Sequence, residues 1–209
     1  AVAASAYRRL APLRGTIERV VLLGPAHRVY LREIAVPSDE RFATPLGEVH
    51  VDRGAVGEAL ELPHVVSSRD AHALEHSLEV QVPFLQRVLG DFQLVPLVVG
   101  DVDAESVAAV IDRLWGDDST LIVVSTDLSH YHPYDEACRI DGETVAAIER
   151  FDADIAGEQA CGARVLNGLG VVARRRGLAI ERLQVCNSGD TAGPRDRVVG
   201  YGAWTLNDA

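Results

Sequence analysis

Apolar runs that stop abruptly at polar residues are the most informative pattern along this 209-residue chain. Residues 121–124 form one such run and lead into Asp127 and His130, and residues 20–23 form another that leads through a Gly-Pro turn to His27. Short apolar runs bounded by turn residues predict buried strands, and open α/β sheets bind ligands beyond the carboxyl ends of their strands. If these strands are parallel neighbours, we expect the three side chains to converge at one edge of the sheet.

The rest of the chain predicts alternating strands and helices. A strand at 92–99, a helix at 104–114 and the strand at 121–124 form a β-α-β crossover, which favours parallel pairing. Segments 33–36 and 49–51 predict a local hairpin or flap at an edge of the sheet. We expect further strands at 65–66, 180–186 and 198–204, and helices at 1–10, 54–61, 77–89, 133–150, 152–160 and 162–176. The length fits a single α/β domain spanning residues 1–209.

The composition narrows the possible functions. A net charge of -11 without a basic stripe disfavours binding to nucleic acid or to anionic lipid. The chain contains no lysine, which excludes a P-loop and imine-forming catalysis. Three widely spaced cysteines favour neither a disulfide framework nor a zinc knuckle. Because the sequence has no apolar run of about 20 residues and no signal-peptide pattern, we expect a soluble, cytoplasmic protein without a membrane partner.

Each candidate site residue also has an ordinary structural interpretation. A lone histidine such as His27 is more often a hydrogen-bonded loop residue, but polar neighbours at an equivalent strand end favour a shared crevice. Glu75 and His76 are equally consistent with a solvated helix start and with a pocket wall. Cys161 precedes Gly162 at a predicted helix start, where the helix dipole lowers the pKa of a thiol and favours a metal-binding thiolate. By default, however, an isolated cysteine is a small buried apolar residue.

Three familiar catalytic patterns are weak or missing. Residues 168–173 match the GxGxxA pattern of dinucleotide-binding proteins, but they lie inside a predicted helix, which favours helix packing instead. The chain lacks the GxSxG pattern of a nucleophile elbow and the HExxH pattern of zincins. A serine hydrolase and a zinc metalloprotease therefore have little support.

Five ordered motifs carry a resemblance to a known family. They are GPAH at 24–27, EHSLE at 75–79, STDLSH at 125–130, CG at 161–162, and NSGD at 187–190 together with VVGYGA at 198–203. In these motifs, and over the chain from Ala1 to about Trp204, the sequence resembles Memo-like proteins, whose bacterial and archaeal members are called AmmeMemoRadiSam system protein B.

The resemblance implies a fold and a ligand set. Because the family is similar in fold to class III extradiol ring-cleaving dioxygenases, it implies a mixed, largely parallel central sheet flanked by helices, with a metal pocket at the strand ends. The family holds its metal with two histidines and the cysteine of the Cys-Gly motif, so His27 and Cys161 match two ligands. Asp127 and His130 match a pocket aspartate and an acid/base histidine. The first family histidine lies in a Pro-His-Ala-Gly-Tyr motif that is absent here.

That departure shapes what we expect of this chain. The sequence contains no methionine and its first helix has no cap, so we expect that material upstream is missing. With two of three implied ligands, the chain should bind metal weakly or be empty. Iron(II) is the metal we favour narrowly, with copper or zinc as alternatives, since a thiolate ligand suits all three.

The leading functional hypothesis is a metal-dependent oxygenase or oxidoreductase acting on a small molecule. His130 would then be the general acid/base, Asp127 would orient it or contact substrate, and His76 with Glu75 would line the substrate pocket. The alternative is a non-catalytic adaptor that receives a peptide or partner protein in the same pocket. Other AmmeMemoRadiSam system proteins are candidate partners. A hydrolase with zinc-activated water is a weaker third option.

Overall fold

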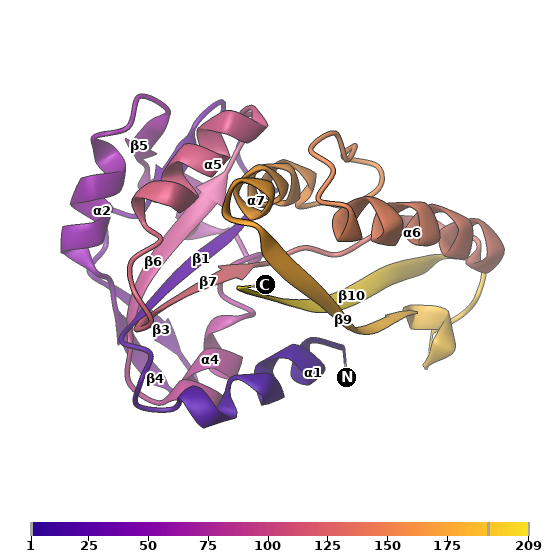
Figure 1. Cartoon of the computed structure of the whole chain (residues 1–209), viewed down its shortest axis with the longest axis horizontal. Helices are drawn as coiled ribbons and strands as arrows, with labels where there is room; N and C mark the ends of the chain where they lie inside the picture. The colour runs from indigo at the N-terminus through magenta and orange to yellow at the C-terminus, as the bar shows by residue number, and fades with distance from the viewer. Residues whose placement is uncertain (1, 192, 209) are drawn as a thin grey trace.

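A mixed five-stranded sheet forms the centre of the molecule in the computed structural model, which describes residues 2–191 and 193–208 (Figure 1). Three strands run parallel, β6 (Gln93–Val99), β1 (Arg19–Pro25) and β7 (Thr120–Val124), with β1 in the middle. A parallel pair, β2 (Ile34–Val36) and β5 (Val65–Ser67), completes the sheet, and β2 joins β6 antiparallel. The strand order is therefore β5-β2-β6-β1-β7. The expected mixed, largely parallel α/β sheet is confirmed.

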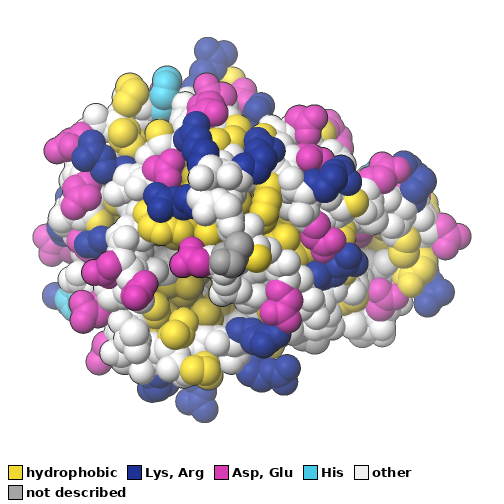
Figure 2. All heavy atoms as spheres, in the orientation of Figure 1, with side chains coloured by type: hydrophobic (Ala, Val, Ile, Leu, Met, Phe, Trp, Pro, Cys, Tyr) yellow, Lys and Arg dark blue, Asp and Glu magenta, His cyan; other side chains and the backbone are white. Residues whose placement is uncertain are grey.

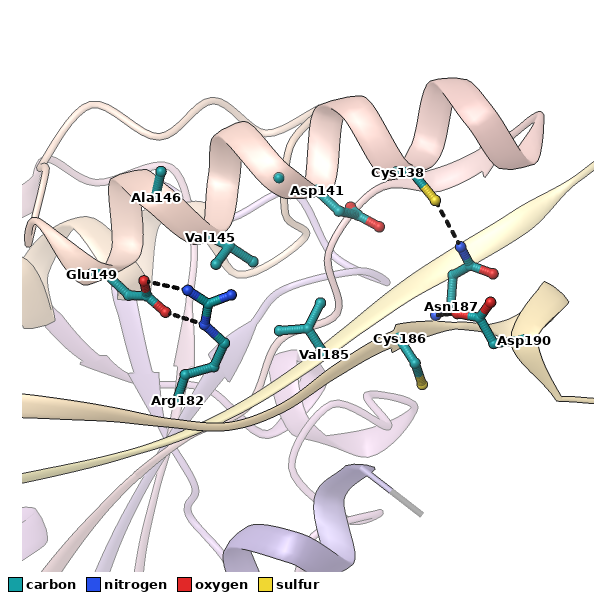
Figure 3. Close-up of a pocket in the computed structure, with 11 residues that line it drawn as sticks. Cys138, Asp141, Val145, Ala146, Glu149, Arg182, Val185, Cys186, Asn187 and Asp190 are labelled. Carbon is teal, nitrogen blue, oxygen red and sulfur yellow. Dashed lines mark hydrogen bonds and ion pairs between the residues drawn. The ribbon is translucent and has the colours of Figure 1, made fainter.

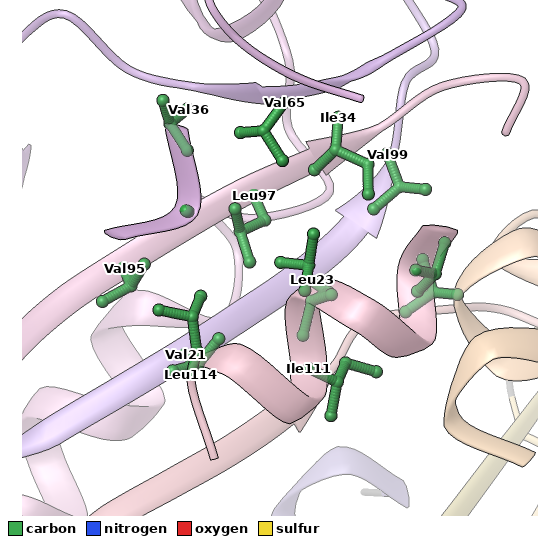
Figure 4. Packing of buried hydrophobic residues seen from close by; sticks show 14 of the residues in the cluster. Val21, Leu23, Ile34, Val36, Val65, Val95, Leu97, Val99, Ile111 and Leu114 are labelled. Carbon is green, nitrogen blue, oxygen red and sulfur yellow. The ribbon is translucent and has the colours of Figure 1, made fainter. Parts of the chain in front are cut away.

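Helices cover both faces of this sheet because its strands are apolar on both sides, as buried parallel strands are. Val21 and Leu23 of β1 face one layer, whereas Val20 and Leu22 face the other. Figure 4 shows the first layer, in which valine, leucine and isoleucine side chains interdigitate. That layer is closed by α2 (Arg53–Leu60), α5 (Ala104–Arg113) and α7 (Ala163–Arg176), and the opposite layer by α1 (Val2–Arg9) and α4 (Val82–Leu89).

A second, antiparallel sheet stands beside the first in the order β8-β10-β9. Its strands are His130–His132, Val198–Asp208 and Leu178–Asn187. The long helix α6 (Tyr134–Glu149) and helix α1 both contact β9 and β10. The remaining elements are α3 (Arg69–Ala73), the 3-10 turns Ala11–Leu13 and Ser188–Asp190, and a hairpin of β3 (Arg41–Thr44) with β4 (Gly47–His50).

Three predictions of element bounds need correction, and one further strand was not predicted. The edge hairpin consists of β3 and β4, while residues 34–36 lie inside the central sheet. The helix expected at 77–89 begins at Val82, because residues 77–81 form turns and a proline occupies its first turn. Residues 152–160 are not helical, since the Asn167 side chain bonds both backbone groups of Ile155. The 130–132 segment is a strand that the pattern did not predict.

The strand at 121–124 is confirmed, but its expected burial is wrong. Every residue of β7 is only half-buried. On one edge β7 pairs with β1, and in the described part of the chain no strand pairs with its other edge. The first helix is confirmed from Val2, while Ala1 lies outside the described residues.

Helix α7 explains the glycine pattern at 168–173. A Cβ added to Gly168 would lie 2.4 Å from the Cβ of Val107 in α5, so the glycine lets the two helices approach closely. The helix-packing interpretation is therefore confirmed. Among the described helices, none is both long and apolar enough to cross a membrane. On the face in Figure 2, acidic and arginine side chains are interspersed.

Candidate functional site

Three chain segments meet at the carboxyl end of the central sheet. His27 follows β1, Asp127 follows β7, and Cys161 precedes the N-cap of α7. Because β1 and β7 are parallel neighbours, their ends point to the same edge, as the sequence predicted. The Asp127 amide donates a hydrogen bond to Cys161 Sγ over 3.2 Å, and the Cys161 amide donates to the Asp127 carbonyl over 3.3 Å. These reciprocal bonds fix the thiol beside the strand end.

A buried carboxylate orients His27. The Glu75 side chain is only 2% exposed, and its Oε1 lies 2.9 Å from His27 Nδ1. Its oxygens also accept hydrogen bonds from the backbone amides of His27, His76 and Ser77. Burial alone would raise the pKa of Glu75, but these donors lower it to about 2. An ionised carboxylate at Nδ1 makes this nitrogen the donor and leaves Nε2 as the ring's second bonding position.

His27 and Cys161 form an interacting pair. Hydrogen bonding to Cys161 is the largest influence on His27 and, with Glu75, raises the histidine's pKa to about 9 against the effect of burial. Burial would raise the pKa of the Cys161 thiol, but hydrogen bonds with His27, the Asp127 amide and Thr126 bring it below its usual value. The direction expected for a thiol at a helix start is therefore right, with specific hydrogen bonds as its cause.

A metal ion of borderline softness fits this pair of donors. His27 offers a ring nitrogen whose partner nitrogen is held by a carboxylate, the usual arrangement around a metal-bound histidine. Cys161 offers a sulfur that favours the thiolate form, which is the form that binds metal. Ligand atoms of His27, Glu75 and His76 also lie within 4.8 Å of one another. Since the Glu75 oxygens already accept several hydrogen bonds, we assign Glu75 to positioning His27.

A second pair of titratable groups lies beside these residues. Asp127 Oδ2 is 3.8 Å from His130 Nε2, and both side chains are partly exposed. Burial raises the pKa of Asp127, while the nearby imidazoles of His130, His27 and His76 oppose that rise. The His76 ring stacks on His27 with centroids 5.0 Å apart. The structure thus brings all six predicted site residues into one neighbourhood at the sheet edge, including Glu75, whose predicted substrate contact stays a prediction.

Comparison with known proteins identifies the family. The family model described as Memo-like protein matches residues 1–205. The chain belongs to the Memo-like family. A MEMO1 family protein of Sulfolobus acidocaldarius is 34% identical over 96% of this chain and 75% of its own length. Those of Aquifex aeolicus and Methanopyrus kandleri are 36% and 35% identical, over 88% and 97% of this chain and 73% and 76% of their own lengths.

A solved structure supports the fold of this Memo-like protein. The uncharacterized protein JW3007 from Escherichia coli K12 superposes with a TM-score of 0.59, covering 94% of this chain and 91% of that one. Because the two sequences are only 16% identical, the superposition shows a shared fold and nothing about a shared function. The architecture around the site is therefore a known one, and its chemistry must be argued from the residues of the Memo-like chain.

Sequence reasoning missed two aromatic residues near this Memo-like site. Tyr131 adopts a left-handed backbone with φ 63°, is 63% exposed and packs its ring edge-on against His130. A bulky residue in that conformation is strained, and such strain clusters at functional sites. Burial, followed by the nearby Asp127, raises the pKa of Tyr201 in β10. Tyr131 directly follows His130 in the chain, and Tyr201 lies in the motif at 198–203, so their positions in the sequence were usable signals.

Proposed function

We propose that this Memo-like chain holds a single metal ion, iron(II) or copper, between His27 Nε2 and the Cys161 thiolate. Bound there, the ion would supply redox or oxygen chemistry on a small organic molecule. The observation that carries the proposal is the arrangement at the strand ends, where the buried Glu75 carboxylate holds Nδ1 of His27 and the Asp127 amide holds the Cys161 sulfur at the same sheet edge. The lowered pKa of the Cys161 thiol agrees with this arrangement. Softer thiolate and imidazole donors suit iron, copper and zinc better than magnesium or calcium.

The neighbouring side chains have separate roles in this proposal. His130, paired with Asp127 at 3.8 Å, accepts or donates a proton at the substrate, and Asp127 orients that ring. His76, half-exposed and stacked on His27, lines the approach to the ion. Glu75 keeps His27 in one orientation and one tautomer from its buried position.

Cobalt(II) titration tests the metal site directly. A thiolate ligand gives cobalt(II) an intense near-ultraviolet charge-transfer band, so the spectrum reports Cys161 as well as occupancy. Because the chain has two of the three implied protein ligands, we expect weak binding, seen as a cobalt-dependent band that approaches one ion per chain only at high cobalt(II) concentration. The band should disappear in Cys161→Ala, and binding should be at least tenfold weaker in His27→Ala. Cys138→Ser is the matched control, because Cys138 is an exposed cysteine on α6. A spectrum that is unchanged in Cys161→Ala, or the absence of binding, refutes the proposal. Competition with iron(II) and copper(I) then ranks the metals.

Oxygen uptake by the iron-loaded chain, with catechol as the probe substrate, tests the role of His130. We expect His130→Ala to lower the rate by about 100-fold without changing metal content, because general acid–base groups contribute factors of this size. His132→Ala is the matched control, since His132 lies in the same short strand. Equal rates in the two variants would exclude proton transfer by His130.

A further inference from the structure

A separate groove lies between helix α6 and strand β9, on the α6 side of the second sheet (Figure 3). It has a volume of about 310 Å³, enough for a small organic molecule. One face of α6 forms its wall, and Val145 and Val185 project into it from opposite sides. None of the six candidate residues of the metal and proton-transfer site lines this groove.

Gly142 opens the groove at the middle of α6. A glycine inside a helix costs about 1 kcal/mol relative to alanine, so its presence there calls for a reason. At Gly168 the reason is close packing, but at Gly142 an added Cβ would meet no described atom within 4 Å. The missing side chain therefore leaves space in the groove instead of making room for a neighbouring element.

Asp141 places a buried carboxylate in the groove lining without a cation to balance it. The residue is 5% exposed, and its Oδ1 accepts a hydrogen bond from the Ser129 amide over 2.9 Å. Throughout residues 2–191 and 193–208, no arginine or histidine forms an ion pair with it. Burial raises the pKa of Asp141, against hydrogen bonding from Ser129 and the weaker influence of His130 and His132, which shows that holding this charge away from water has a cost. A cation in the groove would remove that cost.

The other charges along the groove are already satisfied. At one end Arg182 donates two hydrogen bonds to Glu149, over 2.6 and 2.8 Å, and Figure 3 shows this pair closing the groove. At the opposite end Asp190 accepts hydrogen bonds from the Asn187 amide and from the Tyr134 hydroxyl. Asp141, in the middle and flanked by apolar valines, is the carboxylate of this lining that has neither an ion-pair partner nor a side-chain hydrogen bond among those found in the described residues.

We propose that this groove binds a small organic cation, a primary ammonium carried on an apolar chain or ring. The ammonium group lies against Asp141, and the apolar part lies between Val145 and Val185 in the space left by Gly142. The metal site is not needed for this binding.

Benzylammonium is the probe, with benzyl alcohol and benzoate as neutral and anionic counterparts of similar shape. Trp204 gives the readout, because its indole nitrogen donates a hydrogen bond to Glu149 at the end of the groove. Because Trp115 also fluoresces, the titration uses a Trp115→Phe variant, in which Trp204 is the remaining tryptophan. We expect benzylammonium to change this fluorescence saturably and to bind at least tenfold more tightly than benzyl alcohol, and we expect benzoate not to bind. Isothermal titration calorimetry on the same protein gives the stoichiometry, expected to be one.

Two variants and a control decide the location. Gly142→Leu fills the groove and should abolish binding, and Asp141→Asn should weaken it at least tenfold. Gly57→Leu is the matched control, since Gly57 also lies in a helix, α2, with open space around its Cβ position. Binding that survives Gly142→Leu, or equal binding of the three probes, overturns the proposal. His27→Ala should leave benzylammonium binding unchanged, so failure of the metal proposal and failure of this one are distinguishable.

Discussion

Replacing Glu75 with glutamine removes the charge that holds His27 in place. The carboxylate is 2% exposed and accepts hydrogen bonds from three backbone amides in addition to its contact with His27 Nδ1. Its pKa of about 2, against an ordinary 4.5, means that the folded protein favours the charged carboxylate by about 3 kcal/mol more than water does. Glutamine has one carbonyl oxygen, and its amide group would turn a donor toward other donors.

The expected loss in the free energy of unfolding is about 2–3 kcal/mol at pH 7, because a buried donor left unsatisfied costs about 1–3 kcal/mol and part of the bonding survives. Urea denaturation with matched slopes measures this loss. Cobalt(II) affinity should fall about 10–100-fold, the usual effect of removing the group that orients a ligating histidine.

Glu79→Gln provides the control, since Glu79 is an exposed residue four positions away. This substitution makes the same change of charge and should alter stability by no more than about 0.5 kcal/mol. If Glu75→Gln had an equally small effect on stability, the hydrogen bonds around the carboxylate would contribute nothing net. The assignment of Glu75 as the residue that positions His27 would then be wrong.

Three further substitutions test the scaffold. Burial would raise the pKa of Asp52, but the helix-cap hydrogen bond and the Arg19 guanidinium bring it below the ordinary 3.8. The contribution of the charged Asp52 to the free energy of unfolding is therefore fully present above pH 3.8. It is lost as the pH falls through the lower pKa of the folded state. Asp52→Asn, which keeps a capping side chain, should cost about 1 kcal/mol at pH 7 and progressively less below pH 3.8 in urea titrations, and a pH-independent difference would contradict this. Gly168→Ala should lower stability by about 1–3 kcal/mol because its Cβ would strike α5, whereas helix propensity alone predicts a gain. Gly162→Ala should weaken cobalt(II) binding at least tenfold, since its Cβ would lie 2.7 Å from Thr126, and unchanged affinity would show that the Cys161 position tolerates a shift of α7.

The sequence predicts the convergence of His27 with Asp127 for a simple physical reason. Two apolar runs of strand length, each ending in polar residues, form parallel neighbours, and parallel neighbours end at one edge. This inference needs the order of the local elements and one condition, that the two strands are neighbours in the sheet, which the structure meets. It also predicts where ligands bind without any knowledge of side-chain contacts.

The role of Glu75 could not be predicted in the same way. Its pattern is equally consistent with a solvated helix start, and only the tertiary structure shows that irregular backbone at 75–76 and turns at 77–81 precede α4. The turn exposes the amides of His76 and Ser77 to the carboxylate, which a continuing helix would have satisfied within itself. Pro83 in the first turn of α4 was a usable signal for the helix start.

The Cys-Gly motif owes its form to the same crowded sheet edge. Helix α7 begins so close to the end of β7 that the Gly162 amide donates a hydrogen bond to Thr126 Oγ1 over 2.9 Å. Any side chain at 162 would collide with Thr126 and with the Ser125 carbonyl. The glycine therefore lets the helix start approach the strand end, and the residue before it is brought against the Asp127 amide. The thiol of Cys161 is thus positioned by the absence of a side chain at its neighbour, and the pair acts as one structural unit.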